Sequence, residues 1–184
     1  MGNNATWVVV GSNGSVWAAP VGTAAPTNAT TALNAAFVEM GFVSEEGATF
    51  TEGKDITDIN AWQSFFPIRK MVTGRTVEVS FALREFNRRA VEFALGGTVT
   101  GTAPGPYSYN PPAPEAVVTK AFVLNWADGS KNYRLYIPQG LVTEAVETTL
   151  SRTAAADLPV TFSALDPGSG SIYTLFTNDP AFSS

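Results

Sequence analysis

The segment Val72–Gly97 changes its hydrophobic period once, and this change constrains the fold more than any other feature of the chain. Between Thr76 and Leu83 apolar and polar residues alternate strictly, which is typical of a half-buried strand. The residues that follow adopt the helical period, with Phe86 and Phe93 on one apolar stripe. Gly96 can adopt the positive φ that ends a helix. The sequence therefore predicts a strand that leads into a short helix, which must pack both phenylalanines on a sheet because it is too short to be stable alone.

The rest of the chain is predicted to supply that sheet. Ala116–Trp126 and Asn132–Ile137 read as two strands of a hairpin that turns at Asp128-Gly129. Three further strands are expected at Val142–Leu150, Leu158–Leu165 and Ile172–Phe176, a turn around Glu46-Gly47, and a second short helix at Ala32–Met40. The fold class that these elements favour is mainly β (α+β), an antiparallel β-sandwich or barrel with one packed α-helix.

At 184 residues the chain is long enough for one domain with a real core, and we expect a single domain over residues 1–184. Two segments lack any clear period. Residues 1–36 are expected to form an extended N-terminal arm, and residues 98–114 form a loop rich in proline and glycine. Long loops in compact domains are usually functional or disordered.

The composition argues against most catalytic chemistry. Cysteine and histidine are absent, which removes thiolate nucleophiles, the commonest metal ligand and the best general base near neutral pH. The carboxylate pairs Glu45/Glu46 and Asp55/Asp58 are interpreted as solvated surface, and no glycine-rich stretch has phosphate-loop spacing. We expect no enzymatic activity, no cofactor and no metal. No apolar run spans a bilayer and no export signal is recognisable, so we expect no membrane insertion.

The charged residues are segregated along the chain, although the total is only −5. Residues 1–38 carry no charge, residues 39–58 a net of −5, residues 59–89 a net of +4, and the remainder a net of −4. A nucleic-acid-binding domain would need clustered positive charge on a positive domain. Two interpretations remain open: the blocks neutralise each other within one subunit, or they meet between identical subunits.

The order of elements resembles the major tail tube protein of long-tailed (siphovirus-type) bacteriophages, especially those that infect actinobacteria. The resemblance covers nearly the whole chain, and its most specific part is the phrase MGFVSEEG followed by the strand-to-helix unit. The other matching segments are WAAPVGTAAPT, INAWQS through VEVSFALREFNRRAVEFALGG, and VTFSALDPGSGSIYTLFTNDPAF.

This resemblance implies a structural virion protein that assembles with itself. Its subunits would form hexameric rings that stack head to tail into the tail tube, through which DNA passes at ejection without specific binding. The implied partners are a tape-measure protein, a tail terminator and tail-tip proteins. The implied location is the virion tail, and the host cytoplasm during assembly.

Two sets of residues follow as hypotheses. The inter-subunit candidates are the exposed face of the predicted helix and a possible acidic partner: Arg88, Arg89 and Glu92, with Glu45 and Glu46. The lumen-facing candidates are on the polar faces of two predicted strands: Glu78, Ser80, Thr143, Glu147 and Thr149. The alternative for the second set is the solvated outside of the subunit.

Rival functions stay open at this point. One is a tube protein of the related type VI secretion systems, which the sequence separates only by likeness of phrases. Another is a carbohydrate-binding β-sandwich that would use Trp7, Trp17, Trp62 and Trp126 as a platform. An enzyme with Ser-Lys or carboxylate chemistry ranks third.

Overall fold

The computed structural model describes residues 5–144, 146–168 and 170–183. Its one α-helix in these ranges, α1, spans Arg88–Leu95, and 3-10 turns lie at Ala5–Trp7 (η1) and Pro180–Phe182 (η2). The strands are β1 (Asn13–Pro20), β2 (Val38–Glu39), β3 (Val43–Ile59), β4 (Arg69–Leu83), β5 (Thr98–Thr100), β6 (Ser108–Asn110), β7 (Lys120–Asp128), β8 (Lys131–Val142), β9 (Leu158–Ala164) and β10 (Thr174–Thr177).

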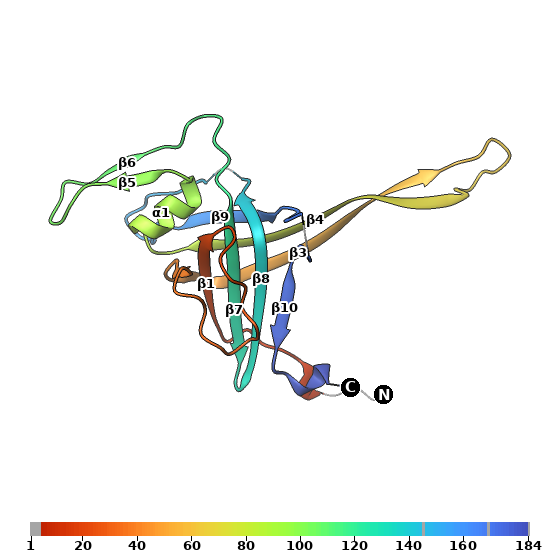
Figure 1. The fold of residues 1–184 in the computed structure, drawn as a ribbon, viewed down its shortest axis with the longest axis horizontal. Coiled ribbons are helices and arrows are strands. Elements are labelled where there is room, and N and C mark those ends of the chain that lie inside the picture. Colours follow the sequence, from red (N-terminus) through yellow and green to blue (C-terminus); the bar gives the residue numbers. More distant parts are fainter. Residues whose placement is uncertain (1–4, 145, 169, 184) are drawn as a thin grey trace.

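Most strands belong to one curled antiparallel sheet in the order β2-β1-β7-β8-β9-β4-β3, with β10 also paired to β8. Strand β8 joins the two halves of this sheet. Its first part, to Ile137, pairs with β7 and β10, whereas Gly140–Val142 pair with β9. In Figure 1 the group β1, β7, β8 and β10 crosses the group β9, β4 and β3. The predicted fold class, antiparallel β with one packed helix, is confirmed.

The core lies between the two halves of the sheet and is rich in aromatic rings. The alternation predicted for β4 is confirmed, because its odd-numbered residues from Val77 to Leu83 are all buried. Phe81 stacks on Phe122 at 5.7 Å, and Phe122 on Phe162 at 4.7 Å between ring centroids. Phe93 of α1 lies 5.9 Å from Phe162. Rings at such spacing contribute about 0.5–1.5 kcal/mol per pair beyond burial itself.

The helix begins later than the period of the sequence indicates. Asn87 is its N-cap, since the Asn87 side chain accepts a hydrogen bond of 2.9 Å from the Ala90 amide. Phe86 therefore precedes the helix and is 63% exposed, so the prediction that it packs on the sheet is wrong. Phe93 is buried as predicted. Gly96 ends the helix at φ 74°, a left-handed conformation that suits glycine.

A long loop, residues 21–37, covers the outer face of β7 and β8. Phe37 packs there with Val123 and Tyr136. The buried Arg134 of β8 donates hydrogen bonds to the carbonyls of Asn28 (2.9 Å) and Thr31 (2.8 Å), which fixes the loop on the sheet. The helix predicted at Ala32–Met40 is wrong, because tertiary burial of Phe37 and Met40 and the pairing of β2 replace it.

Several other expectations for local structure are corrected. The turn around Glu46-Gly47 is instead a bulge inside β3, where the pairing with β4 jumps from Val43 to Ala48 and Gly47 has φ 75°. The strand predicted at Val142–Leu150 is wrong for the described residues, because β8 ends at Val142 and residues 143–144 and 146–150 are irregular. Residues 13–20 of the expected N-terminal arm form β1 in the sheet, and residues 98–114 contain the small hairpin β5–β6.

Candidate self-assembly surfaces

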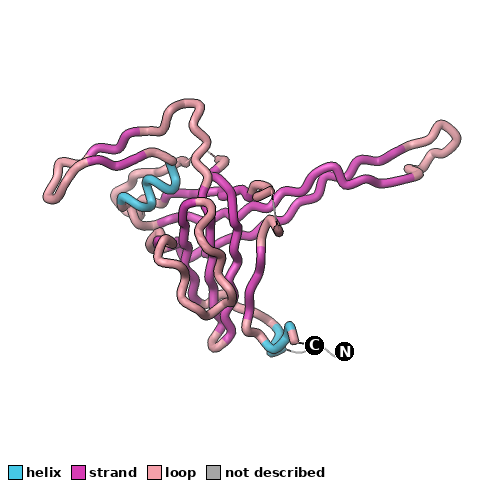
Figure 2. Tube along the Cα trace, viewed as in Figure 1, coloured by secondary structure: helices cyan, strands magenta, loops and turns pink. Residues whose placement is uncertain are grey.

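The hairpin of β3 and β4 extends far beyond the rest of the sheet. The two strands pair from Ala48–Phe81 out to Ile59–Arg69, but β9 accompanies β4 only over Glu78–Leu83. The outer part, residues 52–77, is therefore a free two-stranded ribbon, called the arm below (Figures 1 and 2). Ten residues of strand extend about 33 Å, so the arm tip lies well clear of the core.

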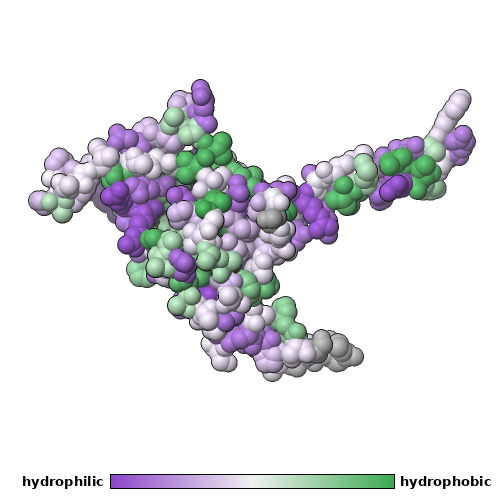
Figure 3. All heavy atoms as spheres, viewed as in Figure 1, coloured by the Kyte–Doolittle hydropathy of each residue, from purple (hydrophilic) through white to green (hydrophobic). Residues whose placement is uncertain are grey.

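The arm exposes many large apolar side chains. They are Ile56, Ile59, Trp62, Phe65, Phe66, Ile68, Met71 and Val72. Trp62 and Phe65 at the tip are fully exposed, and Figure 3 shows hydrophobic residues along the projecting ribbon. An isolated two-stranded ribbon is marginally stable in water, and exposed apolar patches of this kind mark surfaces of interaction. The arm is thus the most prominent candidate for contact with another molecule.

The charges of the arm include one favourable and one unfavourable cross-strand pair, and the favourable one is the 2.7 Å ion pair between Lys70 and Asp58. Lys54 lies directly opposite Arg75 in the strand pairing, and like charges in that position repel. Arg75 reaches Glu52 at 3.8 Å, and Glu52 accepts a 2.9 Å hydrogen bond from the Tyr173 hydroxyl. These groups are largely exposed, so the ion pair contributes little within the subunit. An acidic partner surface would relieve the repulsion.

Helix α1 presents Arg88 and Arg89 to solvent, whereas Glu92 is partly committed to its own subunit. The Glu92 carboxylate accepts hydrogen bonds from the Val99 amide at 2.7 Å and from Arg88 Nε at 3.0 Å. The Val99 bond is the main cause that lowers the pKa of Glu92, and Arg88 adds to it. Of the three helix candidates, Arg89 is the most available to a neighbour.

Glu45 and Glu46 lie on the bulge of β3, on the exposed surface. Both interact electrostatically with Arg84, which forms an ion pair with Asp157 at 3.0 Å. Asp157 raises the pKa of Arg84 by hydrogen bonding and charge, and the two glutamates add smaller effects. In the described residues no ion pair joins Glu45 or Glu46 to the arginines of α1, so their pairing between subunits stays a prediction.

Three of the lumen candidates lie near one another: Glu78 and Ser80 on the polar face of β4, and Thr143 directly after β8. Ser80 lies 3.1 Å from the Thr161 hydroxyl, and Thr143 donates its amide to the Thr161 carbonyl at 3.0 Å. The Thr161 hydroxyl in turn donates to Glu144 at 2.8 Å, so Ser80 must be the donor to Thr161. Glu78 lies on the same face of β4, opposite Ser163.

The remaining lumen candidates have a different setting. Glu147 and Thr149 are exposed in the irregular segment after β8 rather than on a strand. Sequence reasoning missed Thr161 and Glu144, which connect this face to β9. The polar pair Thr143-Glu144 after Val142 was the available signal for Glu144, but it was assigned to a strand.

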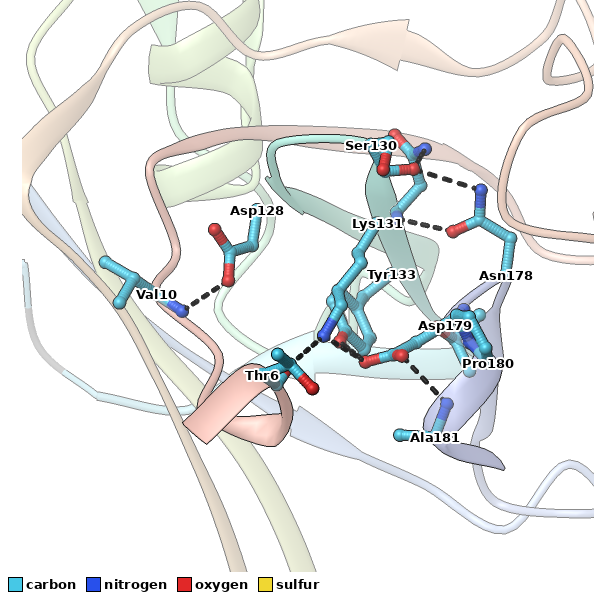
Figure 4. A network of polar contacts seen from close by, with 12 residues as sticks. Thr6, Val10, Asp128, Ser130, Lys131, Tyr133, Asn178, Asp179, Pro180 and Ala181 are labelled. Atoms are coloured by element: carbon cyan, nitrogen blue, oxygen red, sulfur yellow. Dashed lines mark hydrogen bonds and ion pairs between the residues drawn. The ribbon is translucent and has the colours of Figure 1, made fainter. Parts of the chain in front are cut away.

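Both ends of the described chain are held at the β7–β8 turn by a polar network (Figure 4). Lys131 Nζ donates to the Thr6 carbonyl and lies 3.2 Å from an Asp179 carboxylate oxygen. The Tyr133 hydroxyl donates to Asp179 as well, and the Val10 amide donates to Asp128 at 3.1 Å. No local pattern in the sequence predicts that residues so far apart meet.

The structure also bears on the other functions considered. The four tryptophans do not gather: Trp62 is at the arm tip, while Trp126 stacks on Tyr133 at 5.3 Å. Within residues 5–144, 146–168 and 170–183, no cluster of acidic side chains could hold a metal ion. The helices of this part of the chain are all too short or too polar to cross a membrane.

Comparison with protein families decides the class of protein. A family model described as "Phage tail tube protein" matches residues 1–184. The chain belongs to this family. A comparison with curated proteins found none that matches. The resemblance of the sequence to tail tube proteins is therefore confirmed, whereas an origin in phages of actinobacteria stays a prediction.

Membership of the tail tube family has direct consequences. A tail tube protein is a structural component of the bacteriophage virion, located in the tail. It forms a tube by self-assembly together with other tail proteins. The subunit should therefore carry surfaces that are incomplete until other copies cover them, and the arm has this character.

Proposed function

We propose that this tail tube protein assembles into hexameric rings, that the rings stack head to tail, and that the resulting hollow tube conducts DNA during ejection. The protein has no enzymatic role in this proposal. Its further partners are the tape-measure protein, around which the tube grows, and the terminator and tail-tip proteins. Assembly takes place in the host cytoplasm.

The observation that carries the proposal is the arm. A chain that exposes eight large apolar side chains on one narrow ribbon gains by covering them, since each buried apolar side chain contributes about 1.5–3 kcal/mol. Every copy of the subunit carries the same ribbon, so every copy can make the same contact with a neighbour. A contact between two different surfaces of identical copies is heterologous, and such contacts produce rings or open tubes.

The proposed lumen is the polar face of β4 with the segment that follows β8. Glu78, Ser80, Thr143, Glu147 and Thr149 are all polar or acidic, and no arginine or lysine is among them. An acidic or neutral lining suits a conduit, because cationic side chains would bind the phosphates of passing DNA. The overall charge of −5 agrees with this function.

The ring proposal can be tested by the mass of the smallest assembled species. A ring of six 19.4 kDa subunits has a mass of about 116 kDa, and sedimentation velocity or native mass spectrometry over a concentration series would resolve it. We expect that species, followed by larger multiples of it. Assemblies that contain five or seven subunits would contradict the hexameric ring, and a stable dimer as the end state would contradict tube assembly.

A further inference from the structure

A broad groove of about 1190 Å³ opens where the bulge of β3 faces the ends of β1, β7, β8 and β10. Its wall includes aromatic residues among many small and polar ones, and the aromatic residues are Phe42, Phe50, Trp126, Tyr133 and Tyr173. Phe42 is among the most exposed large apolar residues outside the arm tip, at 75%. Concave surfaces that combine apolar side chains with a few placed charged groups are typical of binding sites.

The charge of this groove has one sign. Four carboxylates line it, those of Glu39, Glu45, Glu46 and Glu85, and its lining residues include no lysine or arginine. Glu85 accepts a 3.0 Å hydrogen bond from the Phe42 amide, whereas Glu39, Glu45 and Glu46 are exposed, the last two side by side on the bulge of β3. A ligand that fits must therefore bring apolar bulk together with positive charge.

The arm has this combination of properties. Its tip, residues 59–69, carries Trp62, Phe65 and Phe66, all strongly exposed. Its one charged side chain is Arg69, which forms no ion pair with any described residue. Behind the tip, Lys54 and Arg75 repel each other across the ribbon. The tip thus offers the apolar bulk and the unpaired cation that the groove lacks.

The tip of one subunit does not reach its own groove. Phe50, at the root of the arm, is part of the groove wall, and the ribbon leads away from it for about 33 Å. Figure 1 shows the arm pointing away from the sheet. The occupant must therefore come from another molecule, and a second copy of the chain is always present in a self-assembling protein.

We propose that the arm tip of one copy docks into this groove of the next copy. Trp62, Phe65 and Phe66 fill the aromatic part, and Arg69 lies against Glu45 and Glu46. The proposal rests on the self-assembly proposed above and names the surface that receives the arm. Every copy carries one tip and one groove, so the contact repeats from head to tail without using up either surface.

Two other segments compete less well for the groove. The loop of the β5–β6 hairpin, residues 101–107, exposes Tyr107 but carries no charge, so it gains nothing from the carboxylates. The N-terminal segment is already part of the groove wall, through Val9 and Gly11. The Val10 amide donates a hydrogen bond to Asp128 of the same subunit, which holds the segment there.

The test uses the lack of cysteine in the chain, which makes any introduced pair unique. The variant Gln63→Cys/Ala48→Cys places one thiol at the exposed tip and one in the groove. With an added disulfide oxidant such as oxidised glutathione, two thiols lose their hydrogens and form one disulfide while the oxidant is reduced. We expect a ladder of covalent oligomers on a denaturing gel. The control is Thr102→Cys/Ala48→Cys, with a thiol on the other hairpin, and it should give no ladder.

Each alternative outcome has a definite meaning. Tubes that form without a ladder from the Gln63 variant would overturn the docking while leaving the proposed function intact. A ladder from the Thr102 control instead would assign the groove to the β5–β6 hairpin and overturn the docking as well. A disulfide closed within one monomer would show that the arm folds back. Failure to associate at any concentration, even with the tape-measure and tail-tip proteins added, would overturn both proposals.

A second set of variants checks the charge pairing without cysteine. Phe66→Ser should raise the concentration needed for assembly roughly tenfold or more, the effect of losing one buried aromatic anchor. Glu45→Lys/Glu46→Lys should do the same, and Arg69→Glu added to it should restore assembly. The matched controls Tyr107→Ser and Glu115→Lys, both on exposed residues outside the groove and the arm, should leave it unchanged. Lack of rescue by Arg69→Glu would contradict the assigned pairing.

Discussion

Asp179 is a carboxylate with almost no solvent exposure, and it connects both ends of the chain to the sheet. Its side chain is 2% exposed, accepts hydrogen bonds from Tyr133 and from the Ala181 amide, and pairs with Lys131. The Tyr133 hydrogen bond is the main cause that lowers the pKa of Asp179. Burial, followed by Asp179 itself, raises the pKa of Tyr133 to about 12. Folding therefore lowers the pKa of Asp179 and raises the pKa of Tyr133, so that stability is lost at low pH through the first group and at high pH through the second.

The network predicts a plateau of stability between about pH 4 and pH 10. Because the pKa of Asp179 is lowered by folding, its contribution is complete above the unfolded value of 3.8 and is lost as the pH falls through the folded pKa. Because the pKa of Tyr133 is raised, its contribution is complete below 10.0 and is lost as the pH rises through about 12.

The variant Asp179→Asn should lower the Tm by a few degrees within the plateau. It should also weaken the fall of the Tm at acid pH and at alkaline pH. Calorimetry over this pH range measures the effect, with the exposed Asp166→Asn as the control. If the Tm of Asp179→Asn fell at acid pH as steeply as that of the unmodified protein, Asp179 would not be the group that causes the loss of stability there.

The sequence predicted burial correctly for residues in a regular hydrophobic period. It failed at Phe86, where the N-cap of the helix determines whether the side chain is buried. The buried positions of β4 and Phe93 follow from alternation and from helical spacing. Phe86 fits the same helical spacing, but the Asn87 cap places the helix start after it. Asp179 and Arg134 could not be predicted, because their partners come from distant parts of the chain.

At the scale of elements, the strand-to-helix unit was predictable and the arm was not. The unit has a clear period and local signals for its end at Gly96. The arm has no buried face, so no hydrophobic alternation marks its strands, and residues 49–62 read only as a polar, patchy segment. Its available signal was two polar, threonine-containing runs of similar length on either side of residues 60–68.

Excision of the arm should separate folding from assembly. Gly53 and Thr76 are paired across the ribbon, so an Asn-Gly turn can replace residues 54–75. The removed side chains are almost all exposed, and we expect the Tm to change by less than about 4 °C, the shift that about 1 kcal/mol produces. Circular dichroism should show a folded monomer that forms no tubes in electron micrographs. Tubes from the excised variant would refute the role of the arm.

The arginines of α1 provide a second test at this scale. Arg88 and Arg89 occupy the first turn of the helix, where carboxylates are favoured by the helix dipole. Arg88→Glu/Arg89→Glu loses the pair with Glu92, worth about 0.3–0.5 kcal/mol, but should leave the helix intact. If the helix face is an inter-subunit contact, polymerisation is abolished. Intact tubes, as expected for the control Arg152→Glu, would show that this face is only solvated.

At the scale of the whole molecule, the segregation of charge along the chain is visible in the sequence, but the positions of the two blocks in space are not. Lys70–Asp58 and Arg75–Glu52 join the blocks within one subunit, so only the remaining charges are free to meet between subunits. The acidic block contributes the groove rim at Glu45 and Glu46, and the basic block contributes Arg69 at the arm tip. That these lie on separate surfaces follows from the sheet order, which brings the ends of β1, β7, β8 and β10 to the bulge of β3. Such long-range pairing leaves no local trace in the sequence.

The lumen proposal predicts a functional effect without a structural one. Glu147 is exposed, so Glu147→Lys should leave the subunit and the tube intact. In a lumen, the added positive charge attracts DNA phosphate and should slow or stall ejection. Plaque counts and DNA release from purified virions measure the effect against the control Glu115→Lys. Normal infectivity of the Glu147 variant would remove this segment from the lumen.

The most direct test of the central claim is negative-stain electron microscopy of the purified protein over a concentration series. The proposal predicts hollow filaments, or rings with six-fold symmetry, whose abundance rises with concentration. Tail-tip and tape-measure proteins are added if the protein alone does not start a tube. A protein that stays monomeric even with these partners would contradict self-assembly, and solid filaments without a channel would contradict the function as a conduit.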